Sequence, residues 1–206
     1  QNSLRKSGFP VQSKQEITTF EASPNGVRTS TGLTQWRFET PARESVLLVD
    51  QEQVTFQTVE YTSFEAFIKE FLALVDIFAK ITEHDTYGLI SRLGLRYIDQ
   101  IRKQTENDTI ESYLRPPLQG MECDQYCDGR KQYTISTIGK TALPCGRNGM
   151  LAIRIIRGEP GLDLPPDLIP AAPAARRRAD PDEDIAIIDM DHYWEGSIGP
   201  GLDLAV

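Results

Sequence analysis

Residues 92–101 read Arg-Leu-Gly-Leu-Arg-Tyr-Ile-Asp-Gln-Ile, and this run says more about the fold than any other part of the sequence. Its aliphatic and aromatic side chains are typical of a β-strand, which we expect over residues 93–101. Arg96 and Asp99 stand an odd number of positions apart within this run. A strand therefore places their side chains on opposite faces of its sheet.

Charged side chains inside an apolar strand need partners, because a buried charge without one is strongly destabilising. We therefore expect Arg92, Arg96 and Arg102 to pair with acids on neighbouring strands. A different hypothesis is that this strand binds an anionic ligand, with Arg96 and Asp99 as the candidate ligand-binding residues. The run of arginines at 176–178 is a further candidate for contact with such a ligand.

The segment before this strand has the longest helical pattern in the chain. Apolar residues recur every three or four positions from Phe64 to Phe78, which predicts an amphipathic helix over residues 63–81. Thr62 and Glu65 have the spacing of a capping box and predict how the helix begins. The apolar stripe is wide, so we expect this helix to pack on a sheet and to be covered further by another segment or a partner.

Short runs rich in β-branched and aromatic residues predict the other strands. These strands cover residues 33–40, 45–49, 54–61, 133–138, 150–157 and 185–191. The first three follow one another closely, which favours an antiparallel meander. The pattern as a whole predicts an α+β fold, in which the long amphipathic helix packs on a largely antiparallel sheet.

A length of 206 residues favours a single α+β domain over residues 1–206. The part from 158 to 184 is rich in Pro, Ala, Arg and Asp. We expect it to form a long exposed loop.

Several segments occur in an order and spacing that resembles a known family. They are Trp36-Arg37-Phe38, Tyr61 ahead of the Phe-rich helix, residues 92–101, and the later run from Ile187 to Tyr193. The chain is similar in these segments to the TIGR04255 family, a sporadically distributed, mainly bacterial group without an assigned activity. Asp99 and Gln100 stand where that family usually has Asn and Arg. The resemblance implies a bacterial protein, shortened at both ends relative to the family, that belongs to a multi-gene system such as a defence system.

The composition is that of a soluble globular protein, with 39% hydrophobic and 25% charged residues. The net charge of -8 argues against a broad nucleic-acid-binding surface. No apolar run approaches the ~18 residues that span a bilayer, and the N-terminal residues lack the apolar core of a signal peptide. We therefore expect a cytoplasmic protein without a membrane partner.

Asp189, Asp191 and His192 form an Asp-x-Asp-His motif and are the candidate metal ligands. Alternate residues of a strand share a face, so the two carboxylates can hold one divalent cation that polarises a phosphate or activates water. His192 faces the other side unless the strand bends. The alternative is that both carboxylates face solvent or pair with arginines.

The cysteines offer a second possible metal site. Cys123 and Cys127 have a spacing that zinc accepts, and Cys145 and His192 would complete four ligands. A lone cysteine pair is not a zinc framework, however, so free thiols in a reducing compartment are the preferred interpretation.

Two functions remain in competition. The first is a non-catalytic binding or accessory component that works through another protein or through self-association, with no cofactor. It is favoured because the sequence contains no P-loop, dinucleotide fingerprint, His-Glu-x-x-His or Gly-x-Ser-x-Gly motif. The second is a metal-dependent phosphoester or nucleotide hydrolase that uses Asp189 and Asp191.

Overall fold

The computed structural model describes residues 2–23, 26–83, 88–120, 132–143, 147–162, 164–165, 168 and 172–198. The chain divides into two compact units. The first comprises Gln1–Gly88 and Asp167–Arg177, and the second comprises Leu89–Pro166 and Arg178–Val206. The α+β class is confirmed, with the strands divided between two antiparallel sheets. The organisation as a single domain stays a prediction.

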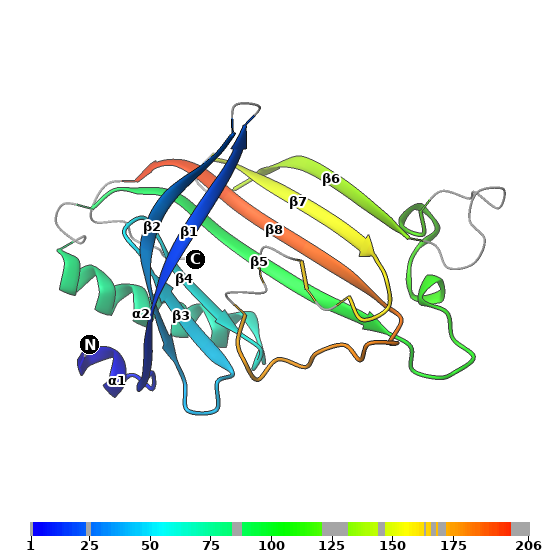
Figure 1. The fold of residues 1–206 in the computed structure, drawn as a ribbon, viewed down its shortest axis with the longest axis horizontal. Coiled ribbons are helices and arrows are strands. Elements are labelled where there is room, and N and C mark those ends of the chain that lie inside the picture. Colours follow the sequence, from blue (N-terminus) through cyan, green and yellow to red (C-terminus); the bar gives the residue numbers. More distant parts are fainter. Residues whose placement is uncertain are drawn as a thin grey trace. The chain divides into compact units, whose positions relative to one another are not determined.

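The first unit contains a four-stranded antiparallel sheet in the order β1-β2-β3-β4 (Figure 1). Its elements are α1 (Asn2–Lys6), β1 (Val11–Ser23), β2 (Gly26–Glu39), β3 (Ser45–Val49), β4 (Val54–Thr58) and α2 (Phe64–Thr82). The predicted meander is confirmed, because β2, β3 and β4 pair in sequence. The long strand β1, which pairs with β2 along its whole length, was not predicted.

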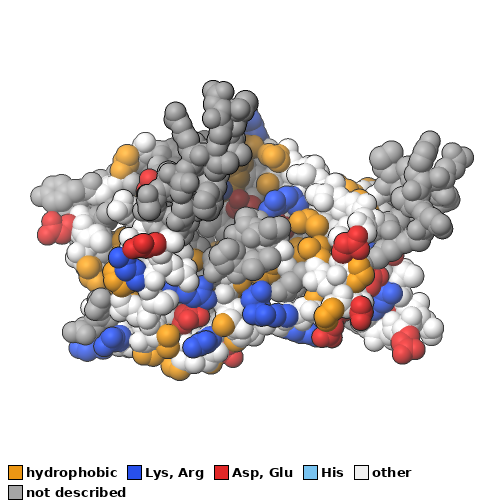
Figure 2. Space-filling model, in the orientation of Figure 1, with side chains coloured by type: hydrophobic (Ala, Val, Ile, Leu, Met, Phe, Trp, Pro, Cys, Tyr) orange, Lys and Arg blue, Asp and Glu red, His pale blue; other side chains and the backbone are white. Residues whose placement is uncertain are grey.

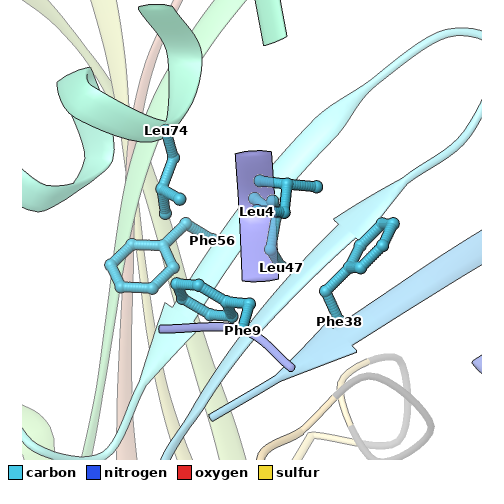
Figure 3. Close-up of a cluster of buried hydrophobic side chains, with 6 residues drawn as sticks. All are labelled: Leu4, Phe9, Phe38, Leu47, Phe56 and Leu74. Atoms are coloured by element: carbon cyan, nitrogen blue, oxygen red, sulfur yellow. The ribbon is translucent and has the colours of Figure 1, made fainter. Parts of the chain in front are cut away.

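One face of this sheet carries the core of the first unit (Figure 3). Phe56 of β4 lies against Phe67 of α2, with ring centroids 5.4 Å apart. Phe9, which follows α1, meets Phe56 edge-on at 6.3 Å. The other core side chains are Leu4, Phe38, Leu47 and Leu74. The predicted packing of a long amphipathic helix on a sheet is therefore confirmed.

Helix α2 begins one residue later than the capping-box pattern indicates. The N-cap is Ser63, whose hydroxyl accepts a hydrogen bond of 3.2 Å from the backbone amide of Ala66. Glu65 accepts hydrogen bonds from its own backbone amide and from the Ser63 hydroxyl, and these bonds lower its pKa. The expectation that Thr62 caps the helix was wrong, because Ser63 offers the same hydroxyl in the register that the helix adopts.

On the opposite face of the first sheet, Arg37 contacts a segment from much later in the sequence. Arg37 of β2 donates to Glu39 and to the carbonyl oxygen of Ala172, both at 3.0 Å. Ala172 is only 7% exposed, and Pro165 is fully buried. The described part of 158–184 is irregular, as predicted, but it is not exposed throughout. Pro165 and Ala172 are apolar, so this segment can bury them inside the protein.

The second unit contains the other four-stranded antiparallel sheet, in the order β5-β8-β7-β6 (Figure 1). Its elements are β5 (Ile90–Arg102), η1 (Ile110–Tyr113), η2 (Pro116–Leu118), β6 (Tyr133–Ala142), β7 (Asn148–Arg157) and β8 (Ile185–Ile198). The strand predicted at 93–101 is confirmed as β5. It pairs with β8, the last strand in sequence, and lies at one edge of the sheet.

The short 3₁₀ helices cover one end of this second sheet. Ile110 and Leu114 pack on Ile155 of β7 and Ala186 of β8. Beside them, the buried guanidinium of Arg157 holds the elements together by binding Asp184 and Glu111. Among the described helices, none combines the length and the apolar content that crossing a bilayer requires.

Candidate functional site

The second sheet has a charged face and an apolar face. Because strand side chains alternate, the register places Asp189 and Asp191 of β8 on one face with Arg96 of β5 and Arg154 of β7. We call this the charged face. His192 lies on the other side, which we call the apolar face. The prediction that His192 separates from the two aspartates is therefore confirmed.

Asp189 is the centre of the charged face and is only 1% exposed. Arg96 binds its carboxylate in a bidentate manner, from Nε at 2.7 Å and from Nη2 at 2.9 Å. Arg154 reaches the same carboxylate from the other neighbouring strand, with its Nε at 2.7 Å. Such charge-assisted hydrogen bonds offset the cost of removing a carboxylate from water. The predicted pairing of Arg96 with an acid on a neighbouring strand is confirmed.

Asp191 continues the network toward solvent. Arg92 binds it at 3.2 Å, and the guanidinium of Arg92 also lies 4.2 Å from the centre of the Tyr193 ring. Further along β5, Arg102 binds Glu183. The arginines of β5 thus pair with successive acids, as the sequence predicts.

A third acid of β8 lies on the charged face, because Glu195 stands opposite Arg92 in register. Arg96 and Arg154 bind the carboxylate of Asp189, and Arg92 binds that of Asp191. The three arginine side chains are also partly accessible, at 53%, 24% and 39% exposure respectively. The cluster therefore presents partly accessible guanidiniums that buried or half-buried carboxylates hold in place.

The apolar face carries half-buried aliphatic and aromatic side chains beyond the part that the 3₁₀ helices cover. On β5 these are Leu93, Leu95 and Tyr97, and Leu93 is 38% exposed. On β8, His192 shares a hydrogen bond of 2.8 Å with Thr141 of β6. A Cβ atom at Gly149, on the strand between them, would come within 3.0 Å of His192 Nε2 and 2.7 Å of Thr141 Oγ1. Glycine at 149 is thus what allows this contact.

The candidate ligand-binding residues Arg96 and Asp99 are not brought together. Arg96 is opposite Asp191 in register, whereas Asp99 is opposite Ile188 and lies on the apolar face. Asp99 is exposed. Arg96 takes part in the charged face and Asp99 does not, so a joint role in binding one ligand stays a prediction without support from the geometry.

Of the candidate metal ligands, Asp189 and Asp191 share the charged face, and His192 lies on the apolar face. The carboxylate of Asp189 is held by two arginines, that of Asp191 faces Arg92, and His192 binds Thr141 on the apolar face. Within the described ranges, no group of three or more His, Cys, Asp or Glu side chains is placed to hold a metal ion. Metal binding by Asp189 and Asp191 stays a prediction.

Other candidate residues fall outside the described part of the chain or outside this sheet. Cys123, Cys127 and Cys145 are among the residues that the structure does not describe. Arg176 and Arg177 belong to the first unit, whereas Arg96 belongs to the second. A joint role for the 176–178 cluster and Arg96 stays a prediction.

Comparison with protein-family models, with curated proteins and with solved structures gave no match to this chain. The resemblance to the TIGR04255 family therefore stays a prediction from the sequence.

The sequence offers no direct signal for two features of this site. Arg154 is far from both β5 and β8 in the chain, and its role depends on the strand order. The position of β5 at the edge of its sheet depends on the same order. Alternation within each strand predicts which residues share a face, but it does not predict which strands become neighbours.

Proposed function

We propose that this chain is a non-catalytic binding protein that associates with another protein through the sheet of its second unit. Its resemblance to a scattered bacterial family supports a role as an accessory component of a multi-gene system. The proposal is carried by one observation. The edge strand β5 presents partly exposed arginines on one face and the exposed Leu93 on the other.

An edge strand of this kind has two properties that favour binding. In an antiparallel sheet, alternate backbone N–H and C=O groups of the edge strand point away from its neighbour and are available to another chain. Side chains on both faces then contribute apolar contact and charge. Proteins often recognise extended segments of a partner in this way.

The charged face supports binding more than catalysis. Its acids accept hydrogen bonds from fixed guanidiniums, so they are arranged as ion pairs. A general base or a metal ligand instead needs lone pairs directed at an open position. On the face of the molecule drawn in Figure 2, Lys and Arg side chains are interspersed with Asp and Glu. Among the residues that Figure 2 draws in colour, no single broad basic area marks a nucleic-acid surface.

Site-specific photo-crosslinking in the cells that make this protein tests the proposal. A photoreactive side chain replaces Leu93 on β5 in one variant and Ile138 on β6 in the other. Ile138 is 63% exposed and is the control for general exposure on the same sheet. We expect one discrete protein, identified by mass spectrometry, to crosslink at position 93 and not at position 138.

Absence of any product at position 93 contradicts the proposal, and so does equal labelling at both positions. A product that contains only this chain would show self-association instead. Light scattering on the purified protein separates that case from association with another protein.

A further inference from the structure

We infer that the arginine run at 176–178 is a cleavage site for an endopeptidase that recognises paired arginines, and that the protein stays assembled after the cut. The reaction is the hydrolysis of one peptide bond. The C–N bond that follows Arg177 or Arg178 breaks, the hydroxyl of a water molecule joins the carbonyl carbon, and the remaining proton of that water goes to the released amino group. This inference is independent of the proposed function.

The arginine run combines a distinctive sequence with an accessible position. Two adjacent arginines occur in this chain only at 176–178. Arg177 and Arg178 are exposed, and residues 177–180 belong to no helix or strand. Exposed irregular stretches are where folded proteins are cut most readily. Successive guanidiniums also offer a protease two side chains that its carboxylates can bind.

Both sides of the run are anchored to the protein. On the N-terminal side, the carbonyl oxygen of Ala172 accepts a hydrogen bond of 3.0 Å from Arg37. On the C-terminal side, Asp184 binds the buried guanidinium of Arg157 at 2.8 Å. The arginine run lies between these anchors, so a cut within it leaves both of them in place.

The smaller product of the cut contains β8, which pairs with β5 on one side and with β7 on the other. Its first three residues, 185–187, are fully buried. Further along, Asp189 binds Arg96 and Arg154 of the two neighbouring strands. Backbone pairing, apolar burial and these ion pairs hold β8 in the sheet without help from the peptide bonds of the arginine run.

The cut changes how the two units are connected. The boundary between them falls between Arg177 and Arg178, and the chain also passes from one unit to the other at 88/89 and at 166/167. Cleavage therefore removes one of three chain connections and takes no strand out of either sheet. An endopeptidase can in this way alter the link between the units while each unit keeps its own hydrophobic cluster.

Digestion of the purified protein with an endopeptidase specific for paired arginines tests the site. We expect one cut, after Arg177 or Arg178, identified by the masses of the two fragments. Arg177→Gln leaves no adjacent arginines and should slow the cut by about a hundredfold, because a site that binds a guanidinium rejects a side chain without one. Arg178→Gln is the matched control. It keeps Arg176 beside Arg177 and should still be cut, and circular dichroism checks that both variants are folded.

Size-exclusion chromatography of the digest tests whether the cut protein stays assembled. Both fragments should elute together in native buffer and separate in urea. A labelled copy of the small fragment, residues 179–206, exchanges into the cut protein and gives the relative affinity by fluorescence anisotropy. In this peptide, Asp189→Asn should weaken the affinity by about a hundredfold, because it removes the carboxylate that Arg96 and Arg154 bind. Asp191→Asn, the control, should weaken it by less than about fivefold.

The two parts of the inference fail separately. A wild-type protein that stays intact, or equal cleavage of Arg177→Gln and Arg178→Gln, would overturn the cleavage site. Fragments that separate in native buffer, or equal losses of affinity in the two peptides, would overturn the assembly of the cut protein through β8.

Discussion

At the scale of single residues, Asp189 is the side chain on which the second sheet most depends. It is almost fully buried, and its carboxylate joins β5 to β7 through Arg96 and Arg154. The sequence predicts the pairing of Arg96 with an acid, because a charged residue in an apolar strand needs one. It cannot predict that Arg154 shares the same acid, because that depends on the order of strands in space.

Replacing Asp189 by Asn should lower the free energy of unfolding by about 3 kcal/mol, because it removes the buried carboxylate charge that two guanidiniums share. The measurement is urea denaturation followed by circular dichroism. Asp191→Asn is the matched control on the same strand and face. Its carboxylate pairs with Arg92, which is 53% exposed, so it should cost less than about 1 kcal/mol. Equal effects of the two changes would contradict this account of the network.

A second residue-scale prediction concerns pH. The Tyr113 hydroxyl donates to Asp108 at 2.5 Å, which raises the pKa of Tyr113 and lowers the pKa of Asp108. The contribution of Asp108 to stability is therefore lost as the pH falls through its lowered pKa. That of Tyr113 is lost as the pH rises through its raised pKa.

Tyr113→Phe should return the pKa of Asp108 toward its ordinary value, as seen by NMR titration of the carboxyl carbon. Tyr133→Phe is the control. Tyr133 has a raised pKa because it is partly buried, and its hydroxyl donates to the Leu118 carbonyl instead. A pKa of Asp108 that does not move in Tyr113→Phe would contradict the assigned hydrogen bond.

At the scale of elements, the sequence predicts best where a segment buries one face. The helix at 63–81 is found at Phe64–Thr82, and the strand at 93–101 is found at Ile90–Arg102. Strand β1 was missed because residues 12–16, which read Gln-Ser-Lys-Gln-Glu, show no apolar alternation. It is an edge strand of its sheet, and an edge strand can form with few buried side chains.

The start of α2 gives an element-scale prediction. Ser63→Ala should lower the free energy of unfolding by about 1 kcal/mol, because the Ala66 amide loses its hydrogen-bond acceptor. It should also raise the pKa of Glu65 toward its ordinary value, since the Ser63 hydroxyl helps to lower it. Thr62→Ala, one position earlier, should change stability by no more than about 0.5 kcal/mol. A larger loss of stability in Thr62→Ala than in Ser63→Ala would identify Thr62 as the N-cap and contradict the assignment of Ser63.

At the scale of the whole molecule, the chain forms two units whose sheets are both antiparallel, and each unit has its own hydrophobic cluster. Sequence alternation predicts the strands and the α+β class. It does not predict that β5 pairs with the last strand, or that Ala172 returns to cover the first sheet. Those arrangements follow from contacts between residues far apart in the chain.

The binding account also makes a prediction about metals. Millimolar Mg²⁺ or Mn²⁺ should leave the melting temperature unchanged, because Arg96 and Arg154 already hold the Asp189 carboxylate. Thermal denaturation with and without the ions is the measurement. A rise in melting temperature that disappears in Asp191→Asn would support the hydrolase alternative and contradict the account.

Hydrogen exchange on the β5 amides tests the central claim most directly. In the free protein, the outward amides of both edge strands should exchange readily, because no further strand of the described residues pairs with them in this sheet. We predict that the partner protein that crosslinks at position 93 slows exchange in β5 (Ile90–Arg102) and leaves β6 (Tyr133–Ala142) unchanged. Protection that is equal in both strands, or absent from β5 while the partner is bound, would contradict the claim that the second sheet binds its partner through β5.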